Sequence, residues 1–294
     1  MMKIVALLLG LSCVLADIEK PDVHLYDMMP SDDDSNSTGN LGICYGSSTT
    51  WSSRPYTVAL RSTTGGACCS GTIISLNPGV ILTAAHCDGC RGQVRIGCDN
   101  PSNCNSAAGY TISQFVQNPS YGRPLQLSND IAVVRLSSAI TVAGAQTRAI
   151  PSVEPSLGRI TVTGYGVNQA GQIPTSLQTM TSNEMDRTEC ASLMRDLLGG
   201  NYIDDSMICI LGGSLGSENV PTMCSGDSGG PMVVGNFVYG ANSWVLQGSG
   251  TGCNSCSCCP GYPQVGSSSA ENAAWIRGYM EAWQKGDYNY TYSA

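Results

Sequence analysis

The segment Cys224-Ser225-Gly226-Asp227-Ser228-Gly229-Gly230-Pro231 places a serine among glycines, which let a backbone bend and let a second chain approach closely. Such a turn can aim the backbone N–H groups of Gly226 and Ser228 at one point. There they would stabilise negative charge on a carbonyl oxygen attacked by the Ser228 hydroxyl, at roughly 3 kcal/mol per donor. Taken alone, the segment would be better interpreted as a glycine-rich surface turn.

A serine hydroxyl needs a base, and the chain contains two histidines. His24 lies in an acidic leader, so His86, in Thr83-Ala84-Ala85-His86-Cys87, is the imidazole available to the rest of the chain. A single histidine after an apolar strand is usually structural. A disulfide at Cys87, however, would hold the backbone of His86 rigidly, which favours a catalytic role.

The third candidate is Asp130, at the start of an apolar run from Ile131 to Leu136. Aspartate is rarely buried without a partner. A hydrogen bond from the imidazole Nδ1–H would satisfy Asp130, fix the tautomer of His86 and stabilise the imidazolium that forms when Ser228 loses its proton. The competing interpretation is a solvated aspartate that caps a strand.

The elements that must position these side chains are short and rich in β-branched residues. Regular short strands between Gly, Pro, Asn and Ser predict a β sandwich or barrel, and Gly235-Asn236 predicts a two-residue hairpin. The strands are expected at 57–61, 71–75, 80–84, 93–97, 131–136, 160–164 and 232–239.

Two helices stand out. Asp186 and Glu189 form a capping box for the first, which Gly199 closes. The second, at 271–284, has an apolar stripe that predicts a packing face. We expect the last ten residues to be a frayed polar tail.

The N-terminal residues predict export. Residues 1–16 combine Lys3, an apolar run and a small-residue cleavage motif, which is typical of a secretory signal peptide, and no stretch is long enough to anchor the chain in a membrane. Residues 17–42 hold seven acidic residues and one lysine, net −6, and read as a solvated leader. Clustered Lys and Arg are lacking, so nucleic acid is not an expected partner.

The number of cysteines fits an exported protein in an oxidising environment. The chain has 15, and removing Cys13 with the signal peptide leaves an even 14, which predicts disulfides. The cluster Cys253, Cys256, Cys258 and Cys259 has spacing compatible with a soft metal, but no histidine accompanies it. We therefore expect no metal and no cofactor.

Together the three segments resemble the chymotrypsin/trypsin family of serine proteases, from about residue 43 to 284. Weaker matches are Pro55-Tyr56-Thr57-Val58-Ala59-Leu60, Cys69-Ser70-Gly71-Thr72, Gly164-Tyr165-Gly166, Ser243-Trp244 and Trp275-Ile276. The resemblance implies an all-β fold of two antiparallel six-stranded β-barrels with a C-terminal α-helix. The N-terminal barrel would occupy about 54–150, the C-terminal barrel about 157–270, the terminal helix 271–284 and the tail 285–294.

The same resemblance implies the roles of further residues. The disulfides Cys69–Cys87, Cys190–Cys209 and Cys224–Cys253 would be those usual in the family. Cys98 stands where calcium-binding relatives carry a glutamate, so calcium is not expected, and Cys98 is expected to pair with Cys104 instead.

The substrate-binding residues implied by the family are Thr222, Met223, Ser243, Trp244, Val245 and Gly261. A buried substrate cation needs a paired charge. No acid stands at these positions, so a preference for small to medium apolar side chains at the P1 position of the substrate, the residue just before the cut, is expected rather than one for Arg or Lys.

Family members are activated by cleavage. The new N-terminal amine would be that of Ile43, and it would pair with Asp227, but Gly42 excludes a protease that cuts after Arg or Lys. Another protease acting in trans is expected to make the cut.

The sequence thus predicts a secreted, monomeric serine endopeptidase that acts on proteins or peptides. Two alternatives stay open: a catalytically inactive homologue that serves as a secreted binding protein, and a cysteine-rich structural or metal-binding protein.

Overall fold

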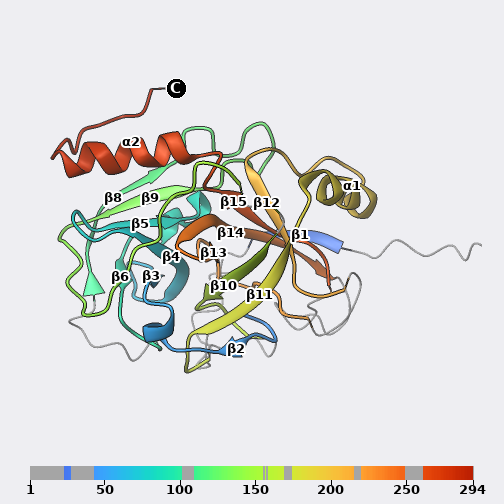
Figure 1. Cartoon of the computed structure of the whole chain (residues 1–294), viewed down its shortest axis with the longest axis horizontal. Coiled ribbons are helices and arrows are strands. Elements are labelled where there is room, and N and C mark those ends of the chain that lie inside the picture. The colour runs from blue at the N-terminus through green and yellow to red at the C-terminus, as the bar shows by residue number, and fades with distance from the viewer. Residues whose placement is uncertain are drawn as a thin grey trace, which may run out of the picture.

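The computed structural model of the chain describes residues 23–27, 43–100, 109–154, 156, 158–168, 174–214, 220–248 and 261–293. These residues form two antiparallel sheets that each curve into a barrel, with one helix beside each sheet (Figure 1). The all-β, two-barrel prediction is confirmed. The signal peptide and the cluster from Cys253 to Cys259 lie outside the described residues.

The N-terminal sheet runs in the order β7-β6-β3-β4-β5-β9-β8. Only Thr111 separates β7 from β8, so the two act as one strand, and a six-stranded ring nearly closes. Its strands are β3 (Thr57–Arg61), β4 (Ala67–Ser75), β5 (Val80–Thr83), β6 (Gln93–Arg95), β7 (Gly109–Tyr110), β8 (Ile112–Gln117) and β9 (Ala132–Leu136).

The C-terminal sheet closes fully, because β15 pairs with both β12 and β14. The ring is β14-β13-β10-β11-β12-β15, and two short strands, β1 and β2, pair with it from outside. Its strands are β10 (Arg159–Gly164), β11 (Gln178–Met185), β12 (Met207–Leu211), β13 (Pro231–Val234), β14 (Phe237–Gly248) and β15 (Gln264–Ser268), with β1 (Val23–Asp27) and β2 (Ser47–Ser48) added.

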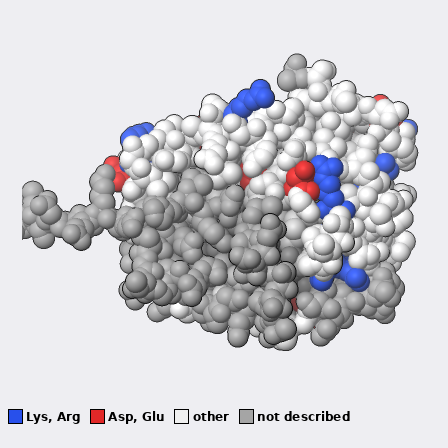
Figure 2. Space-filling model, turned by 180° about the vertical axis from the view of Figure 1, so that it is seen from behind, with Lys and Arg blue, Asp and Glu red and all other residues white. Residues whose placement is uncertain are grey.

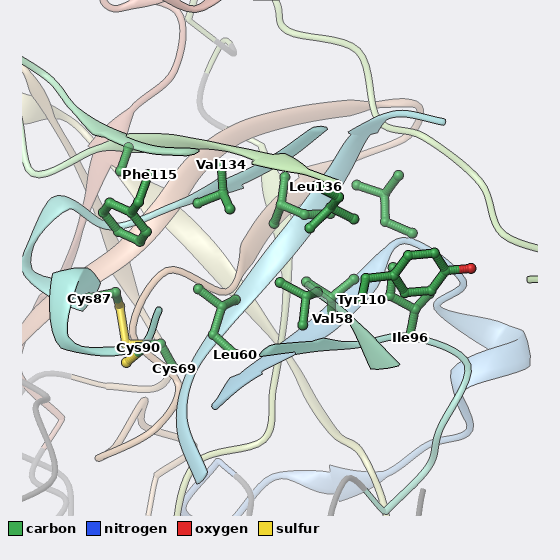
Figure 3. Close-up of a cluster of buried hydrophobic side chains, with 14 of the residues drawn as sticks. Val58, Leu60, Cys69, Cys87, Cys90, Ile96, Tyr110, Phe115, Val134 and Leu136 are labelled. Atoms are coloured by element: carbon green, nitrogen blue, oxygen red, sulfur yellow. A yellow bond between two sulfur atoms is a disulfide. The ribbon is translucent and has the colours of Figure 1, made fainter. Parts of the chain in front are cut away.

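The interior of the N-terminal barrel is apolar and closely packed (Figure 3). Leu60 and Ile81 are fully buried there, and burial of each such side chain contributes roughly 1.5–3 kcal/mol to stability. A Cβ at Gly71 would lie 2.7 Å from Ile81 Cγ2, so glycine lets β4 pass close to β5. The core therefore gives a rigid support to the segment of His86, which follows β5.

The two helices begin close to where the sequence predicts. α1 (Arg187–Leu198) is capped by the carboxylate of Asp186, which accepts the N–H groups of Thr188 and Glu189, and it ends at Gly199 in the left-handed conformation. α2 (Ala273–Gln284) starts two residues later than expected, after Asn272. Its buried face packs against both sheets through a second apolar cluster.

The tail after α2 is packed, so the expectation of a frayed end is wrong. The ring of Tyr290 lies 5.0 Å from that of Tyr279 on α2. The guanidinium of Arg135 lies 4.1 Å above the ring of Tyr288, whose carbonyl accepts a hydrogen bond from Gln114 Nε2. Aromatic side chains at alternating positions bind the tail to β8, β9 and α2.

Charged residues are few in this chain, at 12% Asp, Glu, Lys and Arg. On the face shown in Figure 2, Lys and Arg side chains lie scattered among uncharged ones. Among the helices of the described segments, none has the length and apolar character needed to cross a membrane.

Candidate active site

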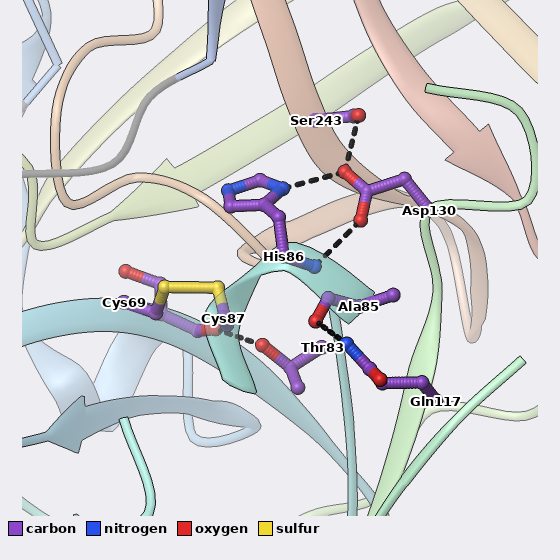
Figure 4. A network of polar contacts seen from close by, with 9 residues as sticks. Cys69, Thr83, Ala85, His86, Cys87, Gln117, Asp130 and Ser243 are labelled. Carbon is purple, nitrogen blue, oxygen red and sulfur yellow. Dashed lines mark hydrogen bonds and ion pairs between the residues drawn. A yellow bond between two sulfur atoms is a disulfide. The ribbon is translucent and has the colours of Figure 1, made fainter. Parts of the chain in front are cut away.

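His86 and Asp130 meet in the structure (Figure 4). His86 lies on a short 3₁₀ helix, η3 (Ala85–Gly89), directly after β5, and Asp130 lies just before β9. Nδ1 of His86 is 2.6 Å from Oδ2 of Asp130, and the backbone N–H of His86 donates to Oδ1 at 2.9 Å. Two contacts thus fix the ring relative to the carboxylate and leave Nε2 as the ring nitrogen for a proton transfer.

The carboxylate of Asp130 is completely buried and receives a third hydrogen bond, from the Ser243 hydroxyl at 2.5 Å. Burial alone would raise the pKa of Asp130. The charge of His86 and the hydrogen bonds from His86 and Ser243 outweigh burial and hold the pKa of Asp130 below its usual value. Asp130 is therefore arranged to stay ionised and to stabilise a protonated His86.

The helix that carries His86 is held from two sides. The disulfide Cys69–Cys87 links it to β4, and Gln117 Nε2 donates to the carbonyl of Ala85 at 2.8 Å. A second disulfide, Cys68–Cys90, joins the neighbouring residue of β4 to the residue after η3. The sequence offered no pairing for Cys68 and Cys90, and the structure shows that two adjacent bridges fix this segment.

In the loop that carries Ser228, the backbone carbonyls of residues 224–228 all accept hydrogen bonds. Ser70 accounts for two of these bonds, since its N–H donates to the carbonyl of Ser228 and its hydroxyl to the carbonyl of Gly226. Val167 N donates to the carbonyl of Ser225, and the carbonyls of Cys224 and Asp227 accept from N–H groups within the loop, those of Asp227 and Gly230. With the carbonyls directed away, the N–H groups of Gly226 and Ser228 remain the candidates to bind a developing oxyanion. Gly226 has φ of +89°, which a side chain would strain.

The Ser228 loop lies against the segment that leads to His86. A Cβ at Gly229 would lie 2.0 Å from Thr83 Oγ1 and 2.7 Å from Ala84 N, so only glycine allows this approach. On the other side, Ser70 N donates to the carbonyl of Ser228 at 2.8 Å, and Ser70 follows the disulfide-bonded Cys69. The structure thus brings the serine loop and the histidine segment together across the two barrels.

Asp227, next to Ser228, is fully buried. Its carboxylate accepts the N–H groups of Gly166 at 2.7 Å and Cys224 at 2.9 Å. Burial raises the pKa of Asp227 to about 7, although the two backbone hydrogen bonds oppose this. A cation delivered to this carboxylate would lower its pKa and stabilise the ionised form.

The segment expected to form the substrate pocket is densely filled. Met223 and Val245 are buried in one apolar cluster together with Ile43. The side chain of Gln264 on β15 is also buried, where it accepts from Met223 N at 2.8 Å and donates to Pro221 O at 2.9 Å.

Sequence reasoning did not name Gln264, which contacts the pocket segment through Met223 N and Pro221 O. Gly261, which it did name, is buried three residues earlier. The remaining residues named for this site are buried: Thr222, whose hydroxyl donates to Val220 O, and Trp244, beside Ser243 on β14.

The structure also contains the disulfide Cys190–Cys209 between α1 and β12. Cys98 and Cys224 are disulfide-bonded as well, but the partners expected for them, Cys104 and Cys253, lie outside the described residues. Within the described part of the chain, the cysteines that come close enough together to suggest a metal site, at β4 and η3, are all engaged in disulfides. They offer no thiolate to a metal.

Comparison with known proteins agrees with this geometry. The family model described as Trypsin matches residues 43–276. The chain is 33% identical to trypsin beta of Drosophila erecta over 241 residues, which cover 79% of this chain and 85% of the relative. It is 32% identical to trypsin alpha-4 of Lucilia cuprina over 281 residues, covering 94% and 97%. It is also 32% identical to trypsin alpha of Drosophila melanogaster over 239 residues, covering 79% and 84%.

Proposed function

The chain belongs to the trypsin family of serine proteases, and from that premise we propose that it is an active, secreted endopeptidase that cleaves proteins or peptides through an acyl-enzyme. Ser228 is the nucleophile, His86 the base, and Asp130 the carboxylate that orients the base. The observation that carries the proposal is the buried Asp130, which accepts hydrogen bonds from His86 and Ser243.

In the proposed reaction the Ser228 hydroxyl attacks the scissile carbonyl and passes its proton to Nε2 of His86. The N–H groups of Gly226 and Ser228 stabilise the oxyanion of the tetrahedral intermediate. His86 then protonates the leaving amine, and the C–N bond breaks to give the acyl-enzyme. A water molecule, deprotonated by His86, releases the acid product and restores Ser228.

The test is labelling of the activated protein by a fluorophosphonate, which reacts with an activated serine. Labelling is expected for the wild type and is expected to vanish in Ser228→Ala. Ser225→Ala, a change of another serine in the same loop, serves as the matched control and should still label. A well-folded wild-type protein that neither labels nor cleaves a peptide library would indicate the inactive homologue that serves as a binding protein.

We further propose a preference for small to medium apolar side chains at P1. Thr222 and Met223 supply no negative charge, and the buried side chain of Gln264 occupies space beside them. A panel of p-nitroanilide substrates tests this preference. Higher kcat/KM for Ala or Val than for Phe is expected, and faster cleavage after Arg or Lys would overturn the assignment.

Activation is proposed to follow cleavage between Gly42 and Ile43, made by another protease. The side chain of Ile43 is already buried, and Cys44 exchanges two backbone hydrogen bonds with Thr222, at 2.9 and 3.0 Å. A new amine at Ile43 would supply a cation to the buried Asp227, which within the described residues is contacted by backbone N–H groups and by no cationic side chain, and an unpaired buried charge is costly. N-terminal sequencing of active protein should give Ile43, and a distant terminus would reject this route.

A further inference from the structure

A half-buried carboxylate outside the proposed triad joins the two barrels close to the start of β9. Asp204 lies between α1 and β12, and its Oδ2 accepts the hydroxyl of Ser128, which belongs to the loop between β8 and β9. Its Oδ1 accepts the hydroxyl of Ser206 at 2.6 Å and the backbone N–H of Ser206 at 3.0 Å. The carbonyl of Ser206 in turn accepts the N–H of Ser268 on β15 at 2.8 Å. Asp204 therefore connects a loop of the first barrel to the closed sheet of the second.

The two hydroxyl groups that bind Asp204 also hold the backbone of the loop before β9. Ser128 Oγ accepts the N–H of Leu125 at 2.9 Å, and Ser206 Oγ accepts the N–H of Asn129 at 2.8 Å. Both serines are buried, so each hydroxyl proton needs an acceptor of its own. An ionised carboxylate offers two acceptor oxygens and no donor. Asp204 receives one hydroxyl on each oxygen and thereby orients both.

Asn129 lies directly before Asp130 and has φ of +54°, in the left-handed region. Residues other than glycine seldom adopt this conformation, although asparagine does so more readily than most. It persists where the surrounding structure determines it. Here the N–H of Asn129 is held by Ser206 Oγ, and its carbonyl accepts the N–H of Ile131 at 2.8 Å. The contact with Ser206 therefore helps to set the direction in which the backbone enters Asp130.

Asp130 is thus held at both of its ends. Its carboxylate lies 2.6 Å from Nδ1 of His86 and accepts the hydroxyl of Ser243 (Figure 4). Its backbone is held through Asn129 by the contacts of Asp204. Both ends matter for the reaction, because a misplacement of about 1 Å in an active site can cost roughly a hundredfold in rate.

We propose that Asp204 is a positioning residue of the active site, which acts through the Ser206 hydroxyl and the backbone of Asn129 to hold Asp130 where it orients His86. This inference rests on the proposed proteolytic function and assigns to the second barrel a part in placing the carboxylate that the first barrel carries. Asp204 contacts serine hydroxyls and backbone, so its effect on the reaction is indirect.

Steady-state hydrolysis of a peptide anilide by the activated protein tests this role, with Asp205→Ala as the matched control for Asp204→Ala. The side chain of Asp205 is 92% exposed and lies 3.5 Å from Arg187, so the control removes the same charge from the adjacent position. We expect kcat to fall roughly tenfold in Asp204→Ala and KM to stay unchanged, because the carboxylate keeps its contacts with His86 and Ser243. Wild-type kcat in Asp204→Ala, or an equal loss in Asp205→Ala, would overturn the inference.

The Asp130→Asn background separates positioning from a general loss of structure. If Asp204 acts through Asp130, the position of this side chain matters little once its charge is gone. Asp130→Asn and the double variant with Asp204→Ala should therefore react with a fluorophosphonate at the same rate. A further tenfold loss in the double variant would show that Asp204 acts by another route and would contradict the proposal.

Ser206→Ala keeps the inference testable where Asp204→Ala does not fold. This change removes the hydroxyl that joins Asp204 to the N–H of Asn129. We expect kcat to fall by at least the same factor of roughly ten, with KM again unchanged. Wild-type kcat in Ser206→Ala would be incompatible with the route proposed for Asp204.

Proton NMR of the full chain gives a readout that does not depend on activity. The Nδ1 proton of His86, in a short hydrogen bond to the carboxylate of Asp130, should give a downfield resonance. We expect this resonance to shift or broaden in Asp204→Ala and to stay unchanged in Asp205→Ala. Identical spectra in both variants would rule out an effect of Asp204 on this pair. Failure of the proposed function would instead appear as absent Ser228-dependent labelling, with the change in the resonance still present.

Discussion

Ser243 offers a sharp test of how the buried carboxylate is maintained. Its hydroxyl donates to Oδ2 of Asp130 at 2.5 Å, the same oxygen that lies 2.6 Å from Nδ1 of His86. Ser243→Ala removes this donor from a fully buried site and leaves the backbone of β14 in place. The carboxylate then loses one of the contacts that hold the pKa of Asp130 down.

The size of the effect follows from the kind of bond removed. A hydrogen bond to a charged group contributes about 1.5–3 kcal/mol, and a change of about 1.4 kcal/mol in the activation barrier is a factor of ten in rate. We expect about half of that contribution to appear as an increase in the activation free energy, because His86 still donates hydrogen bonds to the carboxylate. We expect kcat to fall roughly tenfold and KM to stay unchanged, since the hydroxyl binds Asp130 and not the substrate.

The assay is steady-state hydrolysis of a peptide anilide by the activated protein, with Ser267→Ala as the matched control. Ser267 is equally buried on β15, and within the described residues its hydroxyl has no hydrogen-bond partner. The control should retain wild-type kinetics. Wild-type kcat in Ser243→Ala, or an equal loss in Ser267→Ala, would refute the role given to this hydroxyl.

Three further predictions concern stability and specificity. Burial raises the pKa of Asp227 from 3.8 to about 7 in the folded chain, so its contribution to stability is full below about pH 4 and is lost as pH rises through about 7. Thermal unfolding of the uncleaved chain should show this decline, and Asp227→Asn should flatten it. Replacing Cys68 and Cys90 by serine leaves the nested Cys69–Cys87 bridge closed, so only the short segments between the two bridges gain freedom, and the free energy of unfolding should fall by about 2 kcal/mol. Denaturant titration measures the loss, and labelling of Ser228 should persist. Gln264→Gly should raise the kcat/KM ratio of Phe over Ala substrates roughly tenfold, because added apolar burial contributes about 0.8 kcal/mol per methylene. An unchanged ratio would show that Gln264 does not limit the pocket.

The residues of the proposed triad could be found from sequence because their chemistry is rare in this chain. With one histidine outside the leader, the choice of base was forced. An aspartate directly before an apolar strand signalled a buried charge that needs a partner, and the structure supplies two partners for Asp130. The glycines around Ser228 predicted that another chain segment passes close to this loop. The structure shows such an approach between Gly229 and Thr83 of β5.

Gln264 and β1 escaped prediction for physical reasons. A glutamine carries no catalytic chemistry, and the contacts of Gln264 depend on how β15 lies beside the segment before Ser228, which no local pattern encodes. The composition of the leader favours solvation, but β1 is held through backbone groups that every residue possesses. In the tail, the alternating tyrosines Tyr288, Tyr290 and Tyr292 indicated a packed segment, but the prediction of a frayed end followed the polar residues around them.

The division of the site between two barrels has a consequence for biosynthesis. His86 and Asp130 belong to the first barrel, whereas Ser228 and Ser243 arrive with the second. A nascent chain that has emerged only as far as β9 possesses a base and its carboxylate but nothing for them to activate. Under the proposed mechanism, hydrolytic activity therefore requires that translation is nearly finished and that the Ser228 loop has formed its hydrogen bonds with Ser70 of the first barrel. The proposed protease would thus be unable to cleave other proteins during its own synthesis.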